Sequence, residues 1–349
     1  MINNSFFSTE ILRWFRENGR DLPWRETRDP YAIWLSEIIL QQTRIAQGWE
    51  YWERFVQTYP KVEDLAAASE DDVLKLWQGL GYYSRARNLH TAAKQIVALG
   101  AFPNTLEGIK SLKGVGDYTA AAIGSFAFDI PAAVVDGNVY RVLSRYFGID
   151  TPINSTQGKK EFAALAQSLL PASDAASYNQ GMMDFGAIQC TPQSPKCLLC
   201  PLAETCEALR CGRVEELPVK NKTVKVKTRH LSYIYIRCKS SAADDTGKSE
   251  PMVAIHRRGE GDIWQGLWEP YNVSDVKELP SFVKNPILLA KDVKHVLTHR
   301  ILLADFYLLE TETCPQLPDD YIWIKESEIE DYGVPRLIEI MLEKINPAE

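Results

Sequence analysis

The segment Cys190-Thr-Pro-Gln-Ser-Pro-Lys-Cys197-Leu-Leu-Cys200-Pro-Leu-Ala-Glu-Thr-Cys206 carries four cysteines in a C-x6-C-x2-C-x5-C pattern. Short loops between four thiolates let one stretch of backbone wrap a single compact cluster. The prolines favour the tight, non-helical backbone that such a loop needs. The spacing therefore predicts one 4Fe–4S cluster on Cys190, Cys197, Cys200 and Cys206. A structural zinc site, which usually pairs two short knuckles, and four unrelated buried cysteines are the alternatives.

Length and composition indicate a two-domain protein of a reducing compartment. The 349 residues are enough for two ordinary domains, and contents of 45% apolar and 24% charged residues are typical of soluble globular proteins. No apolar run approaches a membrane span, and the N-terminus lacks the basic start and apolar core of a secretory signal. The cysteine pattern favours a metal site over a disulfide framework. We therefore expect a cytoplasmic protein in which Cys211, Cys238 and Cys314 are ordinary thiols.

The net charge of −7 argues weakly against a nucleic-acid partner. Whole-chain charge is a poor guide, however, when the charge is unevenly distributed. Residues 220–229 carry Lys220, Lys222, Lys225, Lys227 and Arg229 and no acid. This segment is either a solvated linker or a phosphate contact.

The chain changes character near residue 220. Before this point apolar residues recur at helical spacing, as throughout 34–55, and prolines separate the segments. After it, segments 230–237, 252–256 and 301–309 are rich in β-branched and aromatic residues, which is typical of strands. We therefore predict an all-α domain with a metal loop over 1–218, a linker over 219–229 and an α+β domain over 230–349.

The second strong motif is Leu112-Lys-Gly-Val-Gly-Asp-Tyr-Thr-Ala120, which a helix-like segment follows. Gly114 and Gly116 permit a tight turn between two helices and leave backbone N–H groups free at the start of the second. Such a helix start attracts a phosphate, because unpaired donors and the helix dipole both favour an anion. The motif has the form of a helix-hairpin-helix that grips the DNA backbone. The alternative is an ordinary glycine turn between two packed helices.

Asp136 lies between an apolar stretch and a helix with an apolar face. Its residue type and position predict a helix N-cap. Capping is compatible with catalysis, because an N-cap carboxylate is held rigid and ionised. A fixed negative charge of this kind can stabilise a positively charged sugar.

With these three features the chain resembles the helix-hairpin-helix superfamily of DNA base-excision glycosylases. The order of Gly114-Val-Gly116, Asp136 and the cysteine loop is similar to the branch that contains endonuclease III and the adenine DNA glycosylases of the MutY kind. The resemblance covers roughly residues 8–211. It implies a six-helix barrel packed on a second helical lobe that carries the 4Fe–4S cluster, with DNA bound in the cleft between them.

Two positions distinguish the branches of this superfamily. Lyase members carry a nucleophilic lysine where this chain has Tyr118, and tyrosine cannot form the Schiff base of the lyase reaction. Residues 34–43 resemble the adenine glycosylase segment that contains the catalytic glutamate, here Glu37. A carboxyl group in apolar surroundings has a raised pKa and can donate a proton near neutral pH. The alternative for Glu37 is an acid on a helix surface.

The resemblance extends to residues that contact DNA. Leu22-Pro-Trp-Arg25 matches a segment near the substrate cleft, and 79–85 matches a second family segment. Side chains that enter the duplex where a base has left the stack must form hydrogen bonds with the unpaired opposite base and stack on the neighbouring bases. By resemblance, the DNA-binding residues are Arg25, Gln42, Thr43, Leu80, Tyr82, Gly114, Gly116, Thr298 and His299.

The C-terminal domain resembles the Nudix-like domain of adenine glycosylases, and residues 257–269 match its loop and strand. The metal-binding motif of catalytic Nudix relatives is missing from the sequence after residue 220, so we expect a recognition domain. His295-Val-Leu-Thr-His299 matches the family loop that senses 8-oxoguanine, with Leu297 and Thr298 in place of Phe and Ser. Threonine keeps the hydroxyl group, but the aromatic contact is lost. The alternative for Thr298 and His299 is a plain strand entry.

These features together predict a monofunctional adenine DNA glycosylase that acts on adenine opposite 8-oxoguanine or guanine in double-stranded DNA. Glu37 is expected to be the general acid, and Asp136 to stabilise the oxocarbenium ion or attack it transiently. Tyr118 and Asn138 are expected to hold these two carboxylates. We expect a monomer without a membrane partner. The alternatives are an endonuclease III-like lyase and a non-enzymatic metal-binding DNA module.

Overall fold

A computed structural model of the chain describes residues 4–221, 226–239, 250–273 and 282–346. The chain divides into two compact units, Met1–Ala67 with Thr91–Lys222, and Ala68–His90 with Thr223–Glu349. The predicted linker 219–229 overlaps residues 222–225, which lie outside the described part. No helix among the described residues is long and apolar enough to cross a membrane.

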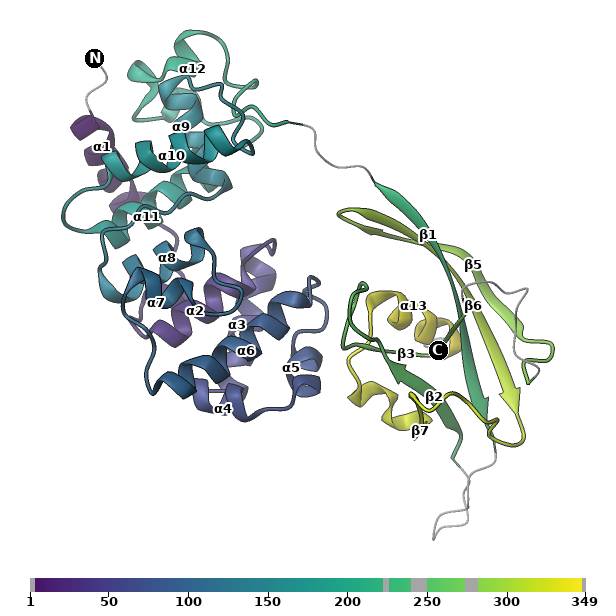
Figure 1. Cartoon of the computed structure of the whole chain (residues 1–349). Helices are drawn as coiled ribbons and strands as arrows, with labels where there is room; N and C mark the ends of the chain where they lie inside the picture. Colours follow the sequence, from purple (N-terminus) through teal and green to yellow (C-terminus); the bar gives the residue numbers. More distant parts are fainter. Residues whose placement is uncertain (1–3, 222–225, 240–249, 274–281, 347–349) are drawn as a thin grey trace. The chain divides into compact units, whose positions relative to one another are not determined.

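The first unit is helical, as the apolar spacing predicts, and Figure 1 shows α1, α9, α10 and α11 gathered together. Short helical turns follow α11 through the cysteine segment. The elements are α1 (Asn4–Asn18), η1 (Pro23–Arg25), α2 (Pro30–Ile39), α3 (Ile45–Thr58), α4 (Val62–Ala67), α6 (Ser84–Leu99, of which Ser84–His90 belong to the second unit), α7 (Leu106–Lys110), α8 (Asp117–Phe128), α9 (Gly137–Phe147), α10 (Thr156–Leu169), α11 (Ala175–Asp184), η2 (Phe185–Gln189), η3 (Cys197–Leu199), η4 (Ala203–Thr205) and α12 (Glu207–Arg210).

The apolar spacing through 34–55 does not belong to one helix. Helix α2 ends at Ile39 and α3 begins at Ile45. Between them Gln42 has a φ of 59°, which is left-handed backbone that cannot continue a right-handed helix. The predicted helical structure is present, but the spacing does not reveal this break, because both helices bury apolar residues and the spacing continues across the turn.

One apolar core joins the helices around the cysteine segment. It contains Ile11 of α1, Leu143 of α9, Phe162 of α10 and Met182 of α11, all buried. Three of the four clustered cysteines pack against this core. The cysteine segment is therefore anchored on the helices, and one of these, α9, begins at the predicted catalytic aspartate.

The second unit is built on a mixed seven-stranded sheet with the main order β3-β2-β1-β6-β5. Strands β1 and β6 pair in parallel along their whole length, and the other pairings are antiparallel. The predicted α+β architecture is confirmed. The elements are α5 (Glu70–Leu76), β1 (Lys227–Cys238), β2 (Met252–Arg257), β3 (Trp268–Glu269), β4 (Tyr271–Val273), β5 (Ile287–Leu297), β6 (Arg300–Thr311), β7 (Tyr321–Lys325), η6 (Glu326–Asp331) and α13 (Arg336–Ile345).

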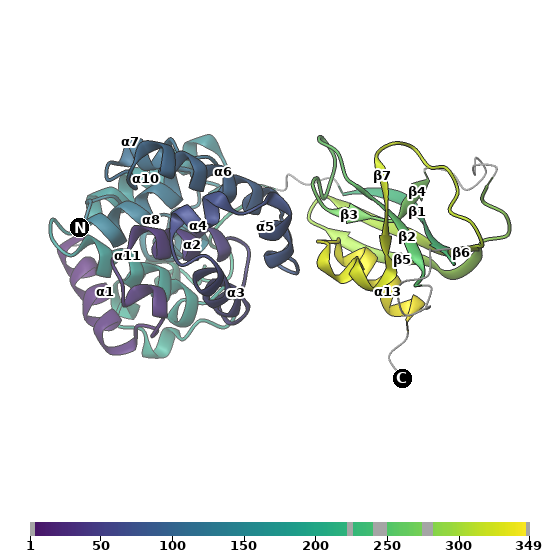
Figure 2. The ribbon, with the colours of Figure 1, turned by 90° about the horizontal axis from the view of Figure 1, so that it is seen from below.

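Helix α13 covers one face of this sheet (Figures 1 and 2). Its buried residues Leu337, Ile338 and Met341 share a core with Tyr233 of β1 and Phe306 of β6. Residues one turn apart on the helix thus bury a single apolar face.

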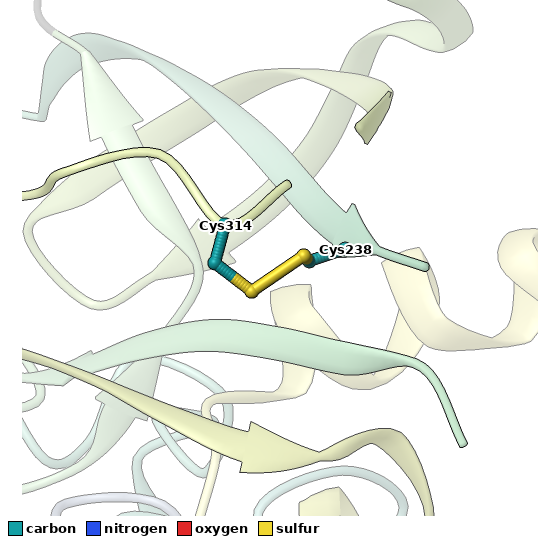
Figure 3. The surroundings of a disulfide bond; sticks show 2 residues. All are labelled: Cys238 and Cys314. Atoms are coloured by element: carbon teal, nitrogen blue, oxygen red, sulfur yellow. A yellow bond between two sulfur atoms is a disulfide. The ribbon is translucent and has the colours of Figure 1, made fainter. Parts of the chain in front are cut away.

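Two cysteines that we expected to be free thiols form a disulfide bond. Cys238, at the end of β1, is bonded to Cys314, which follows β6, with a Cα–Cα distance of 5.3 Å (Figure 3). The prediction of ordinary thiols was wrong for this pair because sequence separation hides the pairing. Strands β1 and β6 place Cys238 opposite Thr311, three residues before Cys314. Cys211 is an exposed free cysteine.

Candidate active site

Glu37 lies on α2, a helix that buries every residue from Tyr31 to Ile39. Only 6% of Glu37 is exposed. The Asp29 side chain caps α2 by accepting a hydrogen bond from the N–H of Tyr31, which fixes the helix start. Helix α2 packs against α8 and α3, so the structure places this acid inside the helical unit. The alternative of a surface acid is therefore excluded.

Tyr118 of α8 holds the Glu37 carboxyl group. Its hydroxyl donates a hydrogen bond of 2.8 Å to Oε2 of Glu37. Burial raises the pKa of Glu37, and the nearby Asp136 also raises it, whereas the Tyr118 hydrogen bond and the Arg25 charge lower it, so that the resulting pKa is about 7. Burial and the nearby carboxylates also raise the pKa of Tyr118 well above its usual value, so the phenol stays a donor. Glu37 is thus poised to exchange a proton near neutral pH.

Asp136 is the N-cap of α9, as predicted. Its Oδ1 accepts a hydrogen bond of 2.7 Å from the N–H of Val139, and its Oδ2 accepts one of 2.7 Å from Nδ2 of Asn138. Burial raises the pKa of Asp136, whereas these donors favour its ionised form. The negative charge of Asp136 raises the pKa of Glu37, so the two predicted catalytic carboxylates are coupled by charge.

Arg141 connects the Asp136 loop with the cysteine segment. Its Nη2 donates to Oδ1 of Asn138 at 2.8 Å, and its Nε donates to the carbonyl oxygen of Cys190 at 2.8 Å. Arg141 is only 8% exposed. Asn138 is therefore held on both sides, by Asp136 and by Arg141, and the two loops have a fixed relative position.

Arg25 is held by Asp184, the last residue of α11. Both oxygens of the buried Asp184 carboxylate accept from the Arg25 guanidinium at 2.8 Å. Arg25 carries the positive charge that acts on Glu37. Sequence reasoning found Arg25 but missed Asp184 and Arg141. A signal for Asp184 was present, since an acid within the apolar run 182–185 needs a buried partner.

The four clustered cysteines line one small cavity together with Arg145 and Gln189. Nη1 of Arg145 lies 3.4 Å from Sγ of Cys190 as a donor. Among the described residues, no group of three or more His, Cys, Asp or Glu side chains is placed so that it could hold a single metal ion. A shared cavity, sulfur ligands that face it and a cationic donor to sulfur fit a polynuclear cluster better than one zinc ion.

Besides Arg25 on η1, four predicted DNA-binding residues of the first unit occupy two turns. Gln42 and Thr43 lie in the turn between α2 and α3, where the left-handed Gln42 redirects the chain. Gly114 and Gly116 lie between α7 and α8, and Gly114 has a φ of 79°, which favours glycine. Gly116 is the N-cap of α8, and a Cβ atom there would meet no atom within 4 Å. The predicted hairpin geometry is therefore present, with an open helix start.

Four predicted DNA-binding residues, Leu80, Tyr82, Thr298 and His299, belong to the second unit. Thr298 and His299 form the two-residue turn of the β5–β6 hairpin. The Tyr82 hydroxyl lies 2.6 Å from Oγ1 of Thr298, whereas Leu80 is buried. Tyr82, Trp264 and the hairpin turn line a cavity of about 500 Å³ within this unit. The alternative of a plain strand entry is excluded, because the turn itself contributes side chains to a cavity.

Comparison with family patterns assigns three parts of the chain. Residues 35–171 match the HhH-GPD superfamily base excision DNA repair protein. Residues 190–206 match the iron-sulfur binding domain of endonuclease III, and residues 247–344 match the NUDIX domain. The second match begins and ends at the first and last clustered cysteines, so the chain has an iron–sulfur site.

Individual proteins resemble the chain along its whole length or over the helical part. The adenine DNA glycosylase of Buchnera aphidicola subsp. Acyrthosiphon pisum is 31% identical over 349 residues, which is 97% of both chains. The adenine DNA glycosylase of Mus musculus is 42% identical over 226 residues, which is 61% of this chain and 44% of the mouse protein. The structure of a thermostable thymine-DNA glycosylase has a TM-score of 0.56 and 34% identity over 60% of this chain and 97% of its own.

Proposed function

Because the chain belongs to the family of adenine DNA glycosylases, and is thus a DNA N-glycosylase, we propose that it removes adenine mispaired with 8-oxoguanine or guanine. The pair of the buried Glu37 and the half-buried Asp136 is the observation that carries this proposal. An acid with a pKa of about 7 and a carboxylate that caps a helix supply the two groups that glycoside hydrolysis needs.

In the proposed reaction the target adenine leaves the base stack and enters the site beside α2. Protonated Glu37 donates its proton to the base, at N7 by family resemblance. The bond between the sugar and the base then breaks, and the electron pair leaves with the neutral adenine. The remaining sugar carries the positive charge of an oxocarbenium ion, which water converts into an abasic site.

Asp136 is proposed to stabilise the oxocarbenium ion or to bond to it transiently. Its hydrogen bonds from Asn138 and from the N–H of Val139 hold the carboxylate still, so little reorganisation is needed as charge develops. Tyr118 holds Glu37 from the other side. Since tyrosine occupies the position of the lyase lysine, the enzyme is proposed to be monofunctional. This argument favours it over an endonuclease III-like lyase.

The DNA contacts remain proposals from residue type and position. The open start of α8 behind Gly116 suits a backbone phosphate. Arg25, Gln42, Thr43, Leu80 and Tyr82 are proposed to contact the distorted duplex. Thr298 and His299, at the tip of the β5–β6 hairpin, are proposed to sense 8-oxoguanine. We further propose that the protein acts as a monomer.

The iron–sulfur site is proposed to hold one 4Fe–4S cluster on Cys190, Cys197, Cys200 and Cys206. When bound, the cluster supplies a rigid cross-link between the turns of the loop and takes no part in bond breakage. Arg145, which donates to Cys190 Sγ and to the carbonyl oxygen of Thr191, orients the first ligand of this site.

Adenine release from Glu37→Gln tests the function. Glutamine fits the same space and can accept the Tyr118 hydrogen bond but cannot supply a proton. We expect single-turnover release from duplexes with 8-oxoguanine or guanine opposite adenine to fall by about 10²–10⁴-fold. Mispair affinity should stay near wild type, and exchange of the exposed Glu17 for Gln serves as the control. Release within tenfold of wild type would refute the proposed role of Glu37.

A further inference from the structure

We infer that Asp184 is a positioning residue of the active site, because it fixes the Arg25 guanidinium and balances its charge and thereby lets Glu37 keep its proton. This inference rests on the proposed function of Glu37 as a general acid. It assigns a catalytic consequence to a residue of α11 that contributes no atom to the Glu37–Tyr118–Asp136 site itself.

The geometry around Asp184 is that of a rigid clamp. Its side chain is fully buried, and its two oxygens accept from Nη1 and Nη2 of Arg25, each at 2.8 Å. The same carboxylate accepts from the backbone N–H of Arg20 at 2.8 Å and from Nε of Arg20 at 2.9 Å. Nη1 of Arg25 also donates to the carbonyl oxygen of Arg20 at 2.9 Å. A bidentate pair with these additional bonds leaves Arg25 one orientation.

The charges that face Glu37 come from three elements. Tyr118 on α8 donates a hydrogen bond to it, Asp136 at the start of α9 favours its protonated form, and Arg25 on η1 favours its ionised form. Arg25 is the cation of this set, and only 13% of its side chain is exposed. A buried guanidinium without a counter-ion would act strongly on a nearby carboxyl group, because little water screens it.

Asp184 opposes that effect in two ways. Its own negative charge, which bonds to Arg25 and Arg20 keep ionised against the cost of burial, cancels part of the field of Arg25. Its two hydrogen bonds also fix the orientation of the guanidinium. With Asp184 neutralised, the positive charge of Arg25 would act on Glu37 without its counter-ion, and the general acid would lose its proton at a lower pH.

A purely structural role for Asp184 predicts something different. Asp184 also joins α11 to the turn that contains Arg20, so its removal destabilises the fold. Loss of folded enzyme lowers the rate equally at every pH at which the remainder is active. The charge-balancing role instead moves the pH at which the rate changes.

The test is the pH profile of single-turnover adenine release by the full-length protein with its cluster, at saturating enzyme, for wild type and Asp184→Asn. We expect the fall in rate at the deprotonation of Glu37 to move to lower pH by about half a unit to one unit. The rate above this inflection should then fall about 3- to 10-fold, with little change on its acid side. An unmoved inflection would overturn the inference.

The double variant Arg25→Gln with Asp184→Asn provides the decisive comparison. It removes the charge that Asp184 balances, so the inflection should return to the wild-type pH or above it. The matched variant Arg20→Gln with Asp184→Asn keeps Arg25 and should retain the shifted inflection. Equal profiles for the two double variants would contradict the inference, because they would show that Arg25 does not transmit the effect.

Two further variants test the inference if Asp184→Asn does not fold. Arg25→Gln alone should move the inflection to higher pH, and Asp184→Glu, which keeps the charge, should leave it near the wild-type value. A change in the opposite sense in either variant would refute the inference. Failure of the proposed function has a separate signature, since Glu37→Gln would then remain active whatever the profile of the Asp184 variants.

Discussion

At the scale of single residues, the active site contains a buried acid whose ionised form is unfavourable. Glu37 is buried, and its pKa is raised from 4.5 to about 7. Folding therefore favours the protonated form. Below the pKa of the unfolded state Glu37 is protonated in both states, so its burial does not lower the free energy of unfolding through ionisation. As the pH rises from 4.5 to 7 the unfolded state releases the proton more readily, so the contribution of Glu37 to stability falls. Above pH 7 Glu37 is ionised in both states, and the loss of stability reaches its full value.

The stability of Glu37→Gln should therefore depend on pH in a defined direction. At pH 8 we expect the variant to exceed wild type in free energy of unfolding by up to about 3 kcal/mol, the equivalent of the pKa change. Near pH 4.5 the gain should vanish. Urea unfolding at both pH values measures this difference in free energy of unfolding, with exchange of the exposed Glu17 for Gln as the control. A variant less stable than wild type at pH 8 would contradict the assigned burial cost.

Asp136→Asn separates capping from catalysis at the second carboxylate. Asparagine caps a helix as well as aspartate does, so the free energy of unfolding should change by less than about 1 kcal/mol. Adenine release should nonetheless fall by about 10²-fold or more, since the neutral amide cannot attract the forming cation. Thermal unfolding and single-turnover kinetics give the two readouts. A nearly silent variant would reduce Asp136 to a structural cap.

At the scale of elements, the second unit depends on pairings between distant segments. Strands β1 and β6 are in parallel register from Lys227↔Arg300 to Cys238↔Thr311. The disulfide between Cys238 and Cys314 closes a separation of 76 residues just beyond the end of this ladder. In the folded state the strands already hold the two cysteines close together. The bond therefore acts mainly on the unfolded chain, whose freedom it restricts.

Cys314→Ser should lower the stability of the second unit without lowering activity. The chain-entropy estimate for a loop of this length is about 4 kcal/mol, an upper value because engineered and natural bridges often contribute less. We expect a lower midpoint of unfolding in Cys314→Ser, and the same shift when wild type is reduced. Excision of adenine opposite guanine should stay near wild type. Cys211→Ser is the matched control, and an equal midpoint in both variants would argue against a stabilising bond.

At the scale of the whole molecule, the residues proposed for catalysis and those proposed for lesion sensing lie in different compact units. Glu37 and Asp136 belong to the first unit, whereas Thr298, His299 and Tyr82 belong to the second. The second unit includes Ala68–His90, a segment from the middle of the helical sequence. Truncation near residue 220 would therefore remove the partners of that segment as well, so point variants of the hairpin are the cleaner probe.

Thr298→Ala combined with His299→Ala should reduce the preference for 8-oxoguanine over guanine opposite adenine. The loss of one or two hydrogen bonds corresponds to roughly 1–3 kcal/mol, or about 5- to 150-fold in preference. Release from the guanine mispair should stay near wild type. Binding and single-turnover rates on both duplexes measure the ratio, with exchange of the exposed Glu312 for Ala as the control. An unchanged ratio would assign lesion sensing to the first unit.

Features that depend on short-range spacing could be predicted from the amino-acid sequence. The cysteine pattern, the Gly114-Val-Gly116 turn and the cap at Asp136 could be predicted because each is set by residues within one or two turns of backbone. The change from helical to strand-like periodicity near residue 220 indicated two architectures. Apolar spacing alone could not place the end of α2, since helix periodicity continues through the left-handed turn at Gln42.

Contacts between residues that are distant in the sequence could not be predicted in this way, because they depend on the folded structure. Glu37 and Asp136 come together because α2 packs against α8, whose Tyr118 touches the first carboxylate while Asp136 at the start of α9 acts on it by charge. The grip of Asp184 on Arg25 and the bond between Cys238 and Cys314 arise in the same way. Burial, charge balance and disulfide formation depend on distances in space. Local sequence patterns do not encode these distances, because packing of whole helices and strands sets them.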